Sequence, residues 1–280
     1  MRKRIIVGTV FVTALLAITI LMPLKFGVLI LVGIALWGQW ELYTILDKAG
    51  YPAHRFLGMI GGAALVIAAW YADRLTLYGG FANLSLAILA ISVVVIFVAQ
   101  LRYGISESCL PRLCGTFLGL LYTPLLLSFM ALLANDWLGE DGRLLVMYLI
   151  SVVKMSDTGA YFTGRALGKH KMVPAISPKK TWEGLAGGIA GSCLAGFIWY
   201  YFTQGDLIVV DITMPHVVVI PVMLAVLGVL GDLIESQFKR AAKIKDSSRS
   251  VPGMGGILDV LDSLLLACPV LYMYVQFVLL

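Results

Sequence analysis

Carboxylates stand at the ends of two neighbouring apolar stretches in the C-terminal part of this 280-residue chain. Asp232 lies near the end of the first stretch, and Asp259 and Asp262 lie three residues apart at the start of the next. Mg²⁺ in phosphate sites takes one or two protein carboxylates together with phosphate oxygens and water. Helix N-terminal caps would explain Asp259 or Asp262, but a helix C-terminus disfavours an anion such as Asp232. The spacing therefore predicts a cation site.

The segment between these carboxylates is rich in lysine and glycine. Glu235, Ser236, Lys239 and Lys243 continue the 3- and 4-residue steps that begin at Asp232, so a continued helix would present them on one face. Basic side chains neutralise the charge that builds up on a leaving phosphate, and glycines let the backbone approach a ligand closely. We expect this segment to bind the phosphates of a Mg²⁺–triphosphate.

A second basic segment precedes the stretch that starts near residue 182. Four lysines crowd residues 169–180, and Thr181 is a predicted helix cap, so the helix N-terminus offers an anion site. A basic loop attracted to anionic lipid headgroups is the alternative. The ordered string Ser177-Pro-Lys-Lys-Thr-Trp-Glu-Gly184 is more specific than charge alone requires, which favours a binding site.

Lys154 and Asp157 lie inside an apolar stretch. They are three residues apart, so they share a helix face and are expected to pair. Charges inside a membrane span are costly and suggest function. An ion pair that only fixes helix packing is the alternative.

The composition requires lipid as the solvent. Hydrophobic residues make up 60% of the chain and charged residues 13%, and the mean hydropathy is +0.93. Soluble domains contain roughly 45–50% apolar and about 25% charged residues. The four cysteines form no CxxC pair and the three histidines lie far apart, so neither type predicts a metal site or a disulfide. We predict an all-α, polytopic integral membrane protein.

Nine candidate membrane spans follow from the apolar stretches, at about 20 residues per span. The first follows Arg2-Lys3-Arg4 without a small-residue cleavage site, so it is expected to be a retained helix rather than a signal peptide. The predicted spans cover residues 5–23, 25–46, 57–73, 81–101, 113–135, 143–164, 182–203, 216–237 and 258–280.

With nine spans, the 21 Lys and Arg residues are distributed very unequally between the two sides of the membrane. All but Lys25, Arg74, Arg143 and Lys154 fall on the side that holds the N-terminus and the two polar segments above. The positive-inside rule places that side in the cytoplasm. We therefore expect a multi-pass protein of the cell membrane with its active site facing the cytoplasm.

The two halves of the chain differ in polarity. Residues 1–140 contain few ionisable groups and are expected to be scaffold helices, whereas residues 141–280 carry the polar clusters and are expected to be catalytic. No internal repeat supports a transporter. The polar residues also gather at helix ends rather than at the membrane midplane, which favours chemistry on a soluble nucleotide over lipid or ion transport.

The run from Ser236 to Asp262 resembles the signature of the CTP:phosphatidate cytidylyltransferases, also called CDP-diacylglycerol synthases. That signature reads S-x-(apolar)-K-R-x₄-K-D, followed after a short spacer by P-x-H-G-G and D-R-x-D. The strings around Asp157, from Ser177 to Gly184 and from Gly231 to Leu233 also look like that family's. The resemblance covers about residues 150–265. The positions in register are Ser236, Lys239, Arg240, Lys245, Asp246, Ser248, Pro252, Gly255, Gly256, Asp259 and Asp262.

The resemblance implies a Mg²⁺-dependent enzyme of phospholipid biosynthesis that converts CTP and phosphatidate to CDP-diacylglycerol and pyrophosphate. It also implies a homodimer in the lipid bilayer, and no nucleic-acid partner is predicted. The roles that it implies are metal binding by Asp232, Asp259 and Asp262; catalysis by Asp232, Asp259, Lys239 and Lys245; phosphate binding by Lys179, Lys180, Arg240, Ser236 and Ser177; and further metal or orienting roles, including a second cation, for Asp157 and Asp246.

Two departures from the signature matter. Met254 replaces its histidine and Val260 replaces its arginine, whereas Val251 is a trivial change. Every expected carboxylate and lysine is retained, which favours an active variant over a paralogue with another substrate. The alternatives are cytidylyl transfer to another lipid phosphate, such as an isoprenoid phosphate, and a non-enzymatic lipid or ion transporter.

Overall fold

A computed structural model of the chain describes residues 24–71, 80–104, 106–134, 136–137, 140–204, 213–248, 250–251 and 255–279. These residues are mostly helical, and their strands form only two small antiparallel pairs. Six of the described helices are long and apolar enough to cross a membrane. This agrees with the predicted polytopic α-helical class.

The candidate spans follow most of the predicted ones. They are Phe26–Lys48, Leu84–Leu101, Cys109–Ala134, Trp182–Thr203, Met214–Ala241 and Leu258–Leu279. Helix α3 (Arg55–Trp70) is shorter, and helix α7 (Arg143–Leu167), where residues 143–164 were predicted to span, is not among the six. The span predicted at residues 5–23 lies outside the described residues. The part of the chain that the structure describes therefore does not confirm nine membrane helices.

The chain divides into two compact units. Of the described residues, the first unit takes those up to Leu132 and those from Phe238 to Leu261. The second takes those from Leu133 to Gln237 and those from Asp262 onward. The first unit thus combines N-terminal helices with a C-terminal segment. The predicted functional division at residue 140 stays a prediction.

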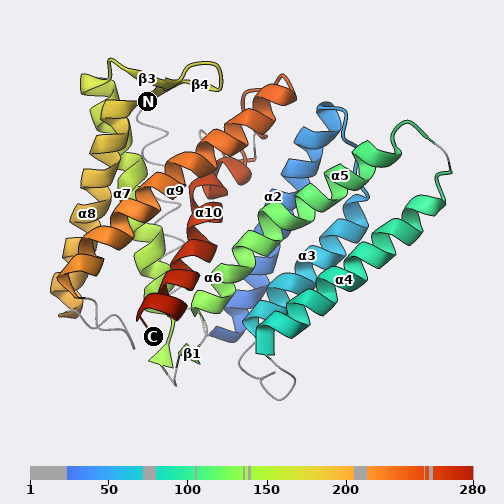
Figure 1. Cartoon of the computed structure of the whole chain (residues 1–280), viewed down its shortest axis with the longest axis horizontal. Helices are drawn as coiled ribbons and strands as arrows, with labels where there is room; N and C mark the ends of the chain where they lie inside the picture. The colour runs from blue at the N-terminus through green and yellow to red at the C-terminus, as the bar shows by residue number, and fades with distance from the viewer. Residues whose placement is uncertain are drawn as a thin grey trace. The chain divides into compact units, whose positions relative to one another are not determined.

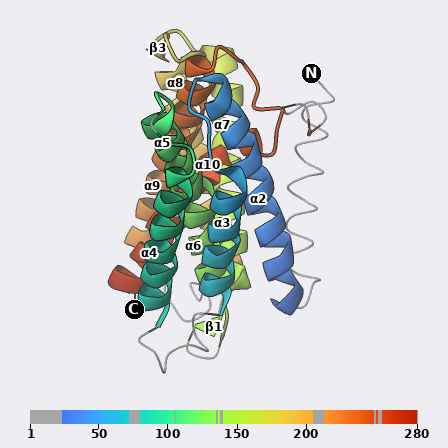
Figure 2. The ribbon, with the colours of Figure 1, turned by 90° about the vertical axis from the view of Figure 1, so that its right-hand side faces the viewer.

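Helices of the first unit pack around buried polar groups as well as apolar ones. They are α2 (Leu24–Lys48), α3, α4 (Gly80–Leu101), α5 (Cys109–Leu120), the π-helical turn η2 (Leu121–Leu125) and most of α6 (Leu126–Ala134). Figure 1 and Figure 2 show these helices from two sides. The fully buried Tyr43 of α2 donates to the carbonyl of Thr116 at 3.1 Å. Gly58 and Gly119 make room for its ring, because a Cβ at either position would overlap it. Glycines thus bring three helices close together.

The π-helical turn η2 follows from a proline. Pro124 lies inside a continuous helical run from Cys109 to Ala134 and has no N–H to donate. A widened turn is one way in which a helix accommodates such a gap.

The second unit contains α7, α8 (Trp182–Thr203), most of α9 (Met214–Ala241), most of α10 (Leu258–Tyr274) and the π-helical turn η3 (Val275–Leu279). Short strands β1 (Asp136–Trp137) and β2 (Glu140–Asp141) pair antiparallel. Helices α7 and α8 approach closely through small residues: a Cβ at Gly159 would overlap the carbonyl oxygen of Gly187. Small residues at helix contacts are typical of membrane proteins.

The basic segment forms a hairpin at one end of α7 and α8, as Figure 1 shows. Strand β3 (Lys171–Val173) pairs with β4 (Ser177–Thr181), which leads directly into α8. The hydroxyl of Thr181 accepts from the amide of Gly184 at 3.1 Å, which confirms the predicted cap. Glu183 in the first turn accepts from the amides of Lys169 and His170 at 3.2 Å and ties the start of the hairpin to α8.

Candidate active site

Three carboxylates converge in the second unit. Asp232 and Glu235 lie one turn apart on α9, Asp262 comes from α10, and an oxygen of each lies within 4.8 Å of the others. Glu235 and Asp262 are buried, and Asp232 is half-buried. A Cβ at Gly231 would overlap the backbone carbonyl of Asp262. The glycine before Asp232 therefore allows α9 and α10 to bring the three acids together.

The donor set of this cluster fits a hard divalent cation. Buried like charges repel each other and lose hydration, so they need positive charge nearby. Carboxylate oxygens are the ligands that Mg²⁺ takes from proteins. Two of the three predicted ligands, Asp232 and Asp262, are in the cluster. The third member, Glu235, was not predicted as a ligand, although its three-residue step from Asp232 was a usable signal.

Lys180 supplies positive charge to the cluster. Its Nζ lies 2.9 Å from Oδ2 of Asp232 and donates to the carbonyl of Val229, also at 2.9 Å. Lys180, which the sequence predicts to bind phosphate, is thus paired with an acidic residue in this structure. Lys179, its neighbour, is exposed, and Ser177 is partly buried at the start of β4.

The predicted pairing of Lys154 and Asp157 is confirmed. Nζ of Lys154 lies 3.1 Å from Oδ2 of Asp157. Ser263 of α10 extends the pair: its hydroxyl accepts from Lys154 at 2.9 Å and donates to Asp157 at 3.1 Å. The pair therefore links α7 to α10, one residue from Asp262.

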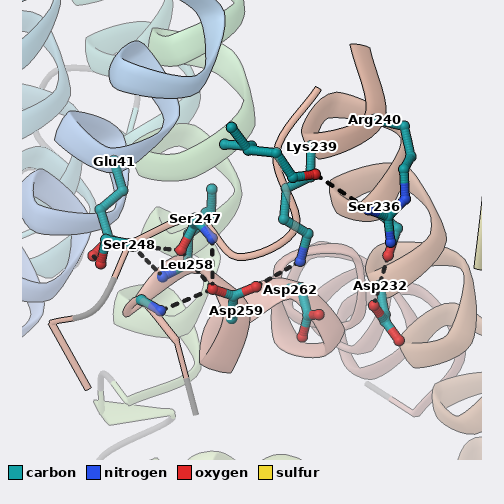
Figure 3. A network of polar contacts seen from close by, with 12 residues as sticks. Glu41, Asp232, Ser236, Lys239, Arg240, Ser247, Ser248, Leu258, Asp259 and Asp262 are labelled. Atoms are coloured by element: carbon teal, nitrogen blue, oxygen red, sulfur yellow. Dashed lines mark hydrogen bonds and ion pairs between the residues drawn. The ribbon is translucent and has the colours of Figure 1, made fainter. Parts of the chain in front are cut away.

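Asp259 lies in the first unit and is surrounded by protein donors (Figure 3). Its Oδ1 lies 2.5 Å from Nζ of Lys239. Its Oδ2 accepts from the amide and the hydroxyl of Ser247, at 3.0 and 2.6 Å, and from the amide of Gly256 at 2.8 Å. Asp259 thus orients Lys239 and holds Ser247 and Gly256, at the two ends of the loop before α10, close together. A metal-binding role for Asp259 stays a prediction.

Glu41 on α2 is a site residue that the sequence analysis missed. It is 4% exposed and accepts hydrogen bonds from the loop between α9 and α10 and from the first amide of α10 (Figure 3). A carboxylate in the interior of the predicted span 25–46 was the available signal, since such a charge suggests function.

The other predicted residues lie on α9 or in the loop that follows it. Ser236 donates to Oδ1 of Asp232 at 3.2 Å, and Arg240 donates to the carbonyl of Ile244 at 3.2 Å. Lys245 and Asp246 are exposed to solvent.

Two positions depart from the signature. Val260, which stands where the signature has arginine, is buried, and Met254 lies outside the described residues.

Comparison with known proteins assigns the family. The family model of the Cytidylyltransferase family matches residues 2–278. The chain belongs to this family. The predicted resemblance is thereby confirmed, and it extends over nearly the whole chain rather than over residues 150–265 alone.

The chain is similar to proteins named phosphatidate cytidylyltransferase. The one from Haemophilus influenzae is 43% identical over 138 residues, which are 49% of this chain and 48% of that protein. The one from Staphylococcus haemolyticus is 42% identical over 132 residues, 47% and 49% of the two chains. These matches span about half the length of those relatives. The one from Bacillus subtilis is 29% identical over 279 residues, 97% of this chain and 96% of that protein.

Proposed function

We propose that this protein is a phosphatidate cytidylyltransferase that makes CDP-diacylglycerol and pyrophosphate from CTP and phosphatidate. The observation that carries the proposal is the end-to-end match with the Bacillus subtilis protein of that name. The buried acid cluster with Lys180 beside it supports the same conclusion, because a nucleotide triphosphate needs carboxylates for its metal and basic groups for its phosphates.

In this reaction an oxygen of the lipid phosphate attacks the α-phosphorus of CTP. A new phosphoanhydride bond forms, and the bond from that phosphorus to the bridging oxygen of pyrophosphate breaks. The phosphate of phosphatidate is ionised at neutral pH, so the reaction needs no protein base. Catalysis then rests on positioning and on neutralising charge.

Asp232, Glu235 and Asp262 are the residues that would hold Mg²⁺, which supplies positive charge to the phosphate oxygens when it is bound. This set includes Glu235 in place of Asp259. Asp259 orients Lys239 instead, through the ion pair described above. Asp157 and Asp246 are weaker candidates for a second cation.

Basic residues bind the phosphates in this proposal. Lys239, Arg240 and Lys245 act from α9 and the following loop, and Lys179 and Lys180 act from β4, with Ser236 and Ser177 as secondary contacts. Lys180 would exchange Asp232 for a phosphate oxygen when CTP binds, because Asp232 would then be a ligand of the cation.

The site faces the cytoplasm in this proposal, where CTP is found. The excess of Lys and Arg in the loops on that side supports this orientation. The homodimer implied by the resemblance is part of the proposal, and cross-linking of the protein in membranes tests it.

Purified protein in mixed micelles with radiolabelled CTP and Mg²⁺ tests the function. A panel of phosphatidate, an isoprenoid phosphate and no lipid serves as acceptors, and EDTA serves as control. We expect a labelled lipid with phosphatidate only, and none with EDTA. Labelling of the isoprenoid phosphate in preference to phosphatidate would refute the assignment, as would no labelling of either lipid.

A further inference from the structure

We propose that Glu41 is a positioning residue that holds the loop after α9 and, through it, Lys239. The proposal rests on the proposed function for its kinetic consequence. Glu41 lies near the end of α2, in the N-terminal half that the sequence analysis treats as scaffold. Its side chain, Lys239 and the loop all belong to the first compact unit.

Glu41 binds the loop through four neutral donors. Its Oε1 accepts from the hydroxyls of Ser248, at 2.6 Å, and Ser250, at 2.5 Å. Its Oε2 accepts from the amide of Leu258 and lies within hydrogen-bond distance of the hydroxyl of Ser247, both at 3.0 Å. A buried carboxylate needs such donors to offset its lost hydration. These bonds fix both ends of the segment from Ser247 to Leu258.

The amide of Leu258 is the first of α10. A helix N-terminus has free N–H groups and a positive dipole end, so an anion there is stabilised. Glu41 therefore caps α10 from another helix, 217 positions earlier in the chain.

Gly255 and Gly256, the two loop glycines that the structure describes, accommodate two carboxylates. A Cβ at Gly256 would overlap both Oε2 of Glu41 and the hydroxyl of Ser247. At Gly255, where φ is +108°, a Cβ would lie 2.5 Å from Oδ2 of Asp259. These glycines thus admit protein carboxylates, where the sequence analysis expected them to admit a ligand. Their presence in the sequence is explained by Glu41 and Asp259 together.

Ser247 connects Glu41 to Lys239. Its buried hydroxyl lies 3.0 Å from Oε2 of Glu41 and 2.6 Å from Oδ2 of Asp259. Its single hydrogen points to one of these carboxylates at a time. The other oxygen of Asp259 is paired with Nζ of Lys239. A chain of three contacts thus runs from Glu41 to the lysine that is proposed to bind phosphate (Figure 3).

Variants of Glu41 differ in how many of these hydrogen bonds they can keep. In Glu41→Gln the amide oxygen accepts from Leu258, and the amide N–H groups donate to Ser248 and Ser250, whose hydroxyls can rotate to accept. Glu41→Leu removes every acceptor. Gln39→Leu is the matched control, because Gln39 is equally buried in α2 but donates to Tyr43 and to the carbonyl of Gly58.

The first measurement is limited trypsin cleavage after the exposed Lys245 in the full-length protein in nanodiscs, followed by mass spectrometry. We expect Glu41→Leu to raise the cleavage rate about tenfold or more, since loop opening becomes easier. Glu41→Gln and Gln39→Leu should stay near the wild-type rate. Equal acceleration by Gln39→Leu, or none by Glu41→Leu, would overturn the proposal.

The second measurement is steady-state kinetics with CTP and phosphatidate. We expect kcat/KM for CTP to fall about 100-fold in Glu41→Leu, as misplacement of a binding group does, and to be largely restored in Glu41→Gln. A Glu41→Leu value close to wild type would overturn the proposal. If Glu41→Leu does not fold, the double variant Ser248→Ala/Ser250→Ala replaces it. We expect this variant to raise the cleavage rate and to lower kcat/KM for CTP, both by smaller factors than Glu41→Leu. A wild-type protein without activity would refute the proposed function, whereas the cleavage assay would still decide on Glu41.

Discussion

Nζ of Lys180, at the end of the β3–β4 hairpin, lies 2.9 Å from Oδ2 of Asp232 on α9. A lysine that is expected to bind phosphate is thus paired with an acid that is expected to bind a metal. The two roles are compatible if the pair opens when the nucleotide and its cation bind, because each partner then gains a new counter-charge.

Lys180→Met should lower kcat/KM for CTP by about 10- to 100-fold, because a hydrogen bond to a charged group contributes about 1.5–3 kcal/mol. Lys179→Met, at the exposed neighbouring position, is the control and should have a smaller effect. Initial rates at varied CTP and fixed Mg²⁺ measure both. A larger loss in Lys179→Met would exclude a special role for Lys180.

Glu235→Gln and Asp262→Asn should each raise the Mg²⁺ concentration needed for half-maximal activity by more than about 100-fold. Residues that only orient ligands cause smaller losses, of about 10- to 100-fold. Glu107→Gln alters an exposed glutamate that has no part in the proposed site, and it serves as control. Mg²⁺ titrations of activity measure the effect, and an unchanged requirement in both variants would show that the acid cluster is not the metal site.

Asp259→Asn separates two roles of this residue. If Asp259 orients Lys239, the variant should lower kcat and leave the Mg²⁺ requirement unchanged, since one oxygen still accepts hydrogen bonds but the ion pair is lost. If Asp259 binds the metal, as the sequence predicts, the Mg²⁺ requirement should rise as in Asp262→Asn. The same titration decides between them.

Gly159→Val should destabilise the protein by about 1–3 kcal/mol, because a Cβ there overlaps the backbone of Gly187 and forces α7 and α8 apart. Gly33→Val is the control in α2, where an added Cβ meets no atom within 4 Å. Thermal unfolding of both variants in one detergent measures the difference. Similar melting temperatures would indicate that the helix contact adjusts without cost.

Features fixed by local geometry could be predicted from the sequence. Apolar stretches of span length give the candidate membrane helices, because lipid excludes unpaired backbone groups. The three-residue step from Lys154 to Asp157 and the cap by Thr181 involve residues within one helical turn, so chain geometry alone brings them together. The signature from Ser236 to Asp262 indicated the family, which the match over residues 2–278 confirms.

The partners of each carboxylate depended on tertiary packing. Asp232, Glu235, Asp259 and Asp262 all occupy suitable helical positions, and only the approach of α9 to α10 past Gly231 selects Glu235 for the acid cluster. Glu41 lies 206 residues before Ser247, and no helical periodicity relates the two. Side chains so far apart in sequence meet only because helices pack, and the desolvation of each buried charge then determines which donors must surround it.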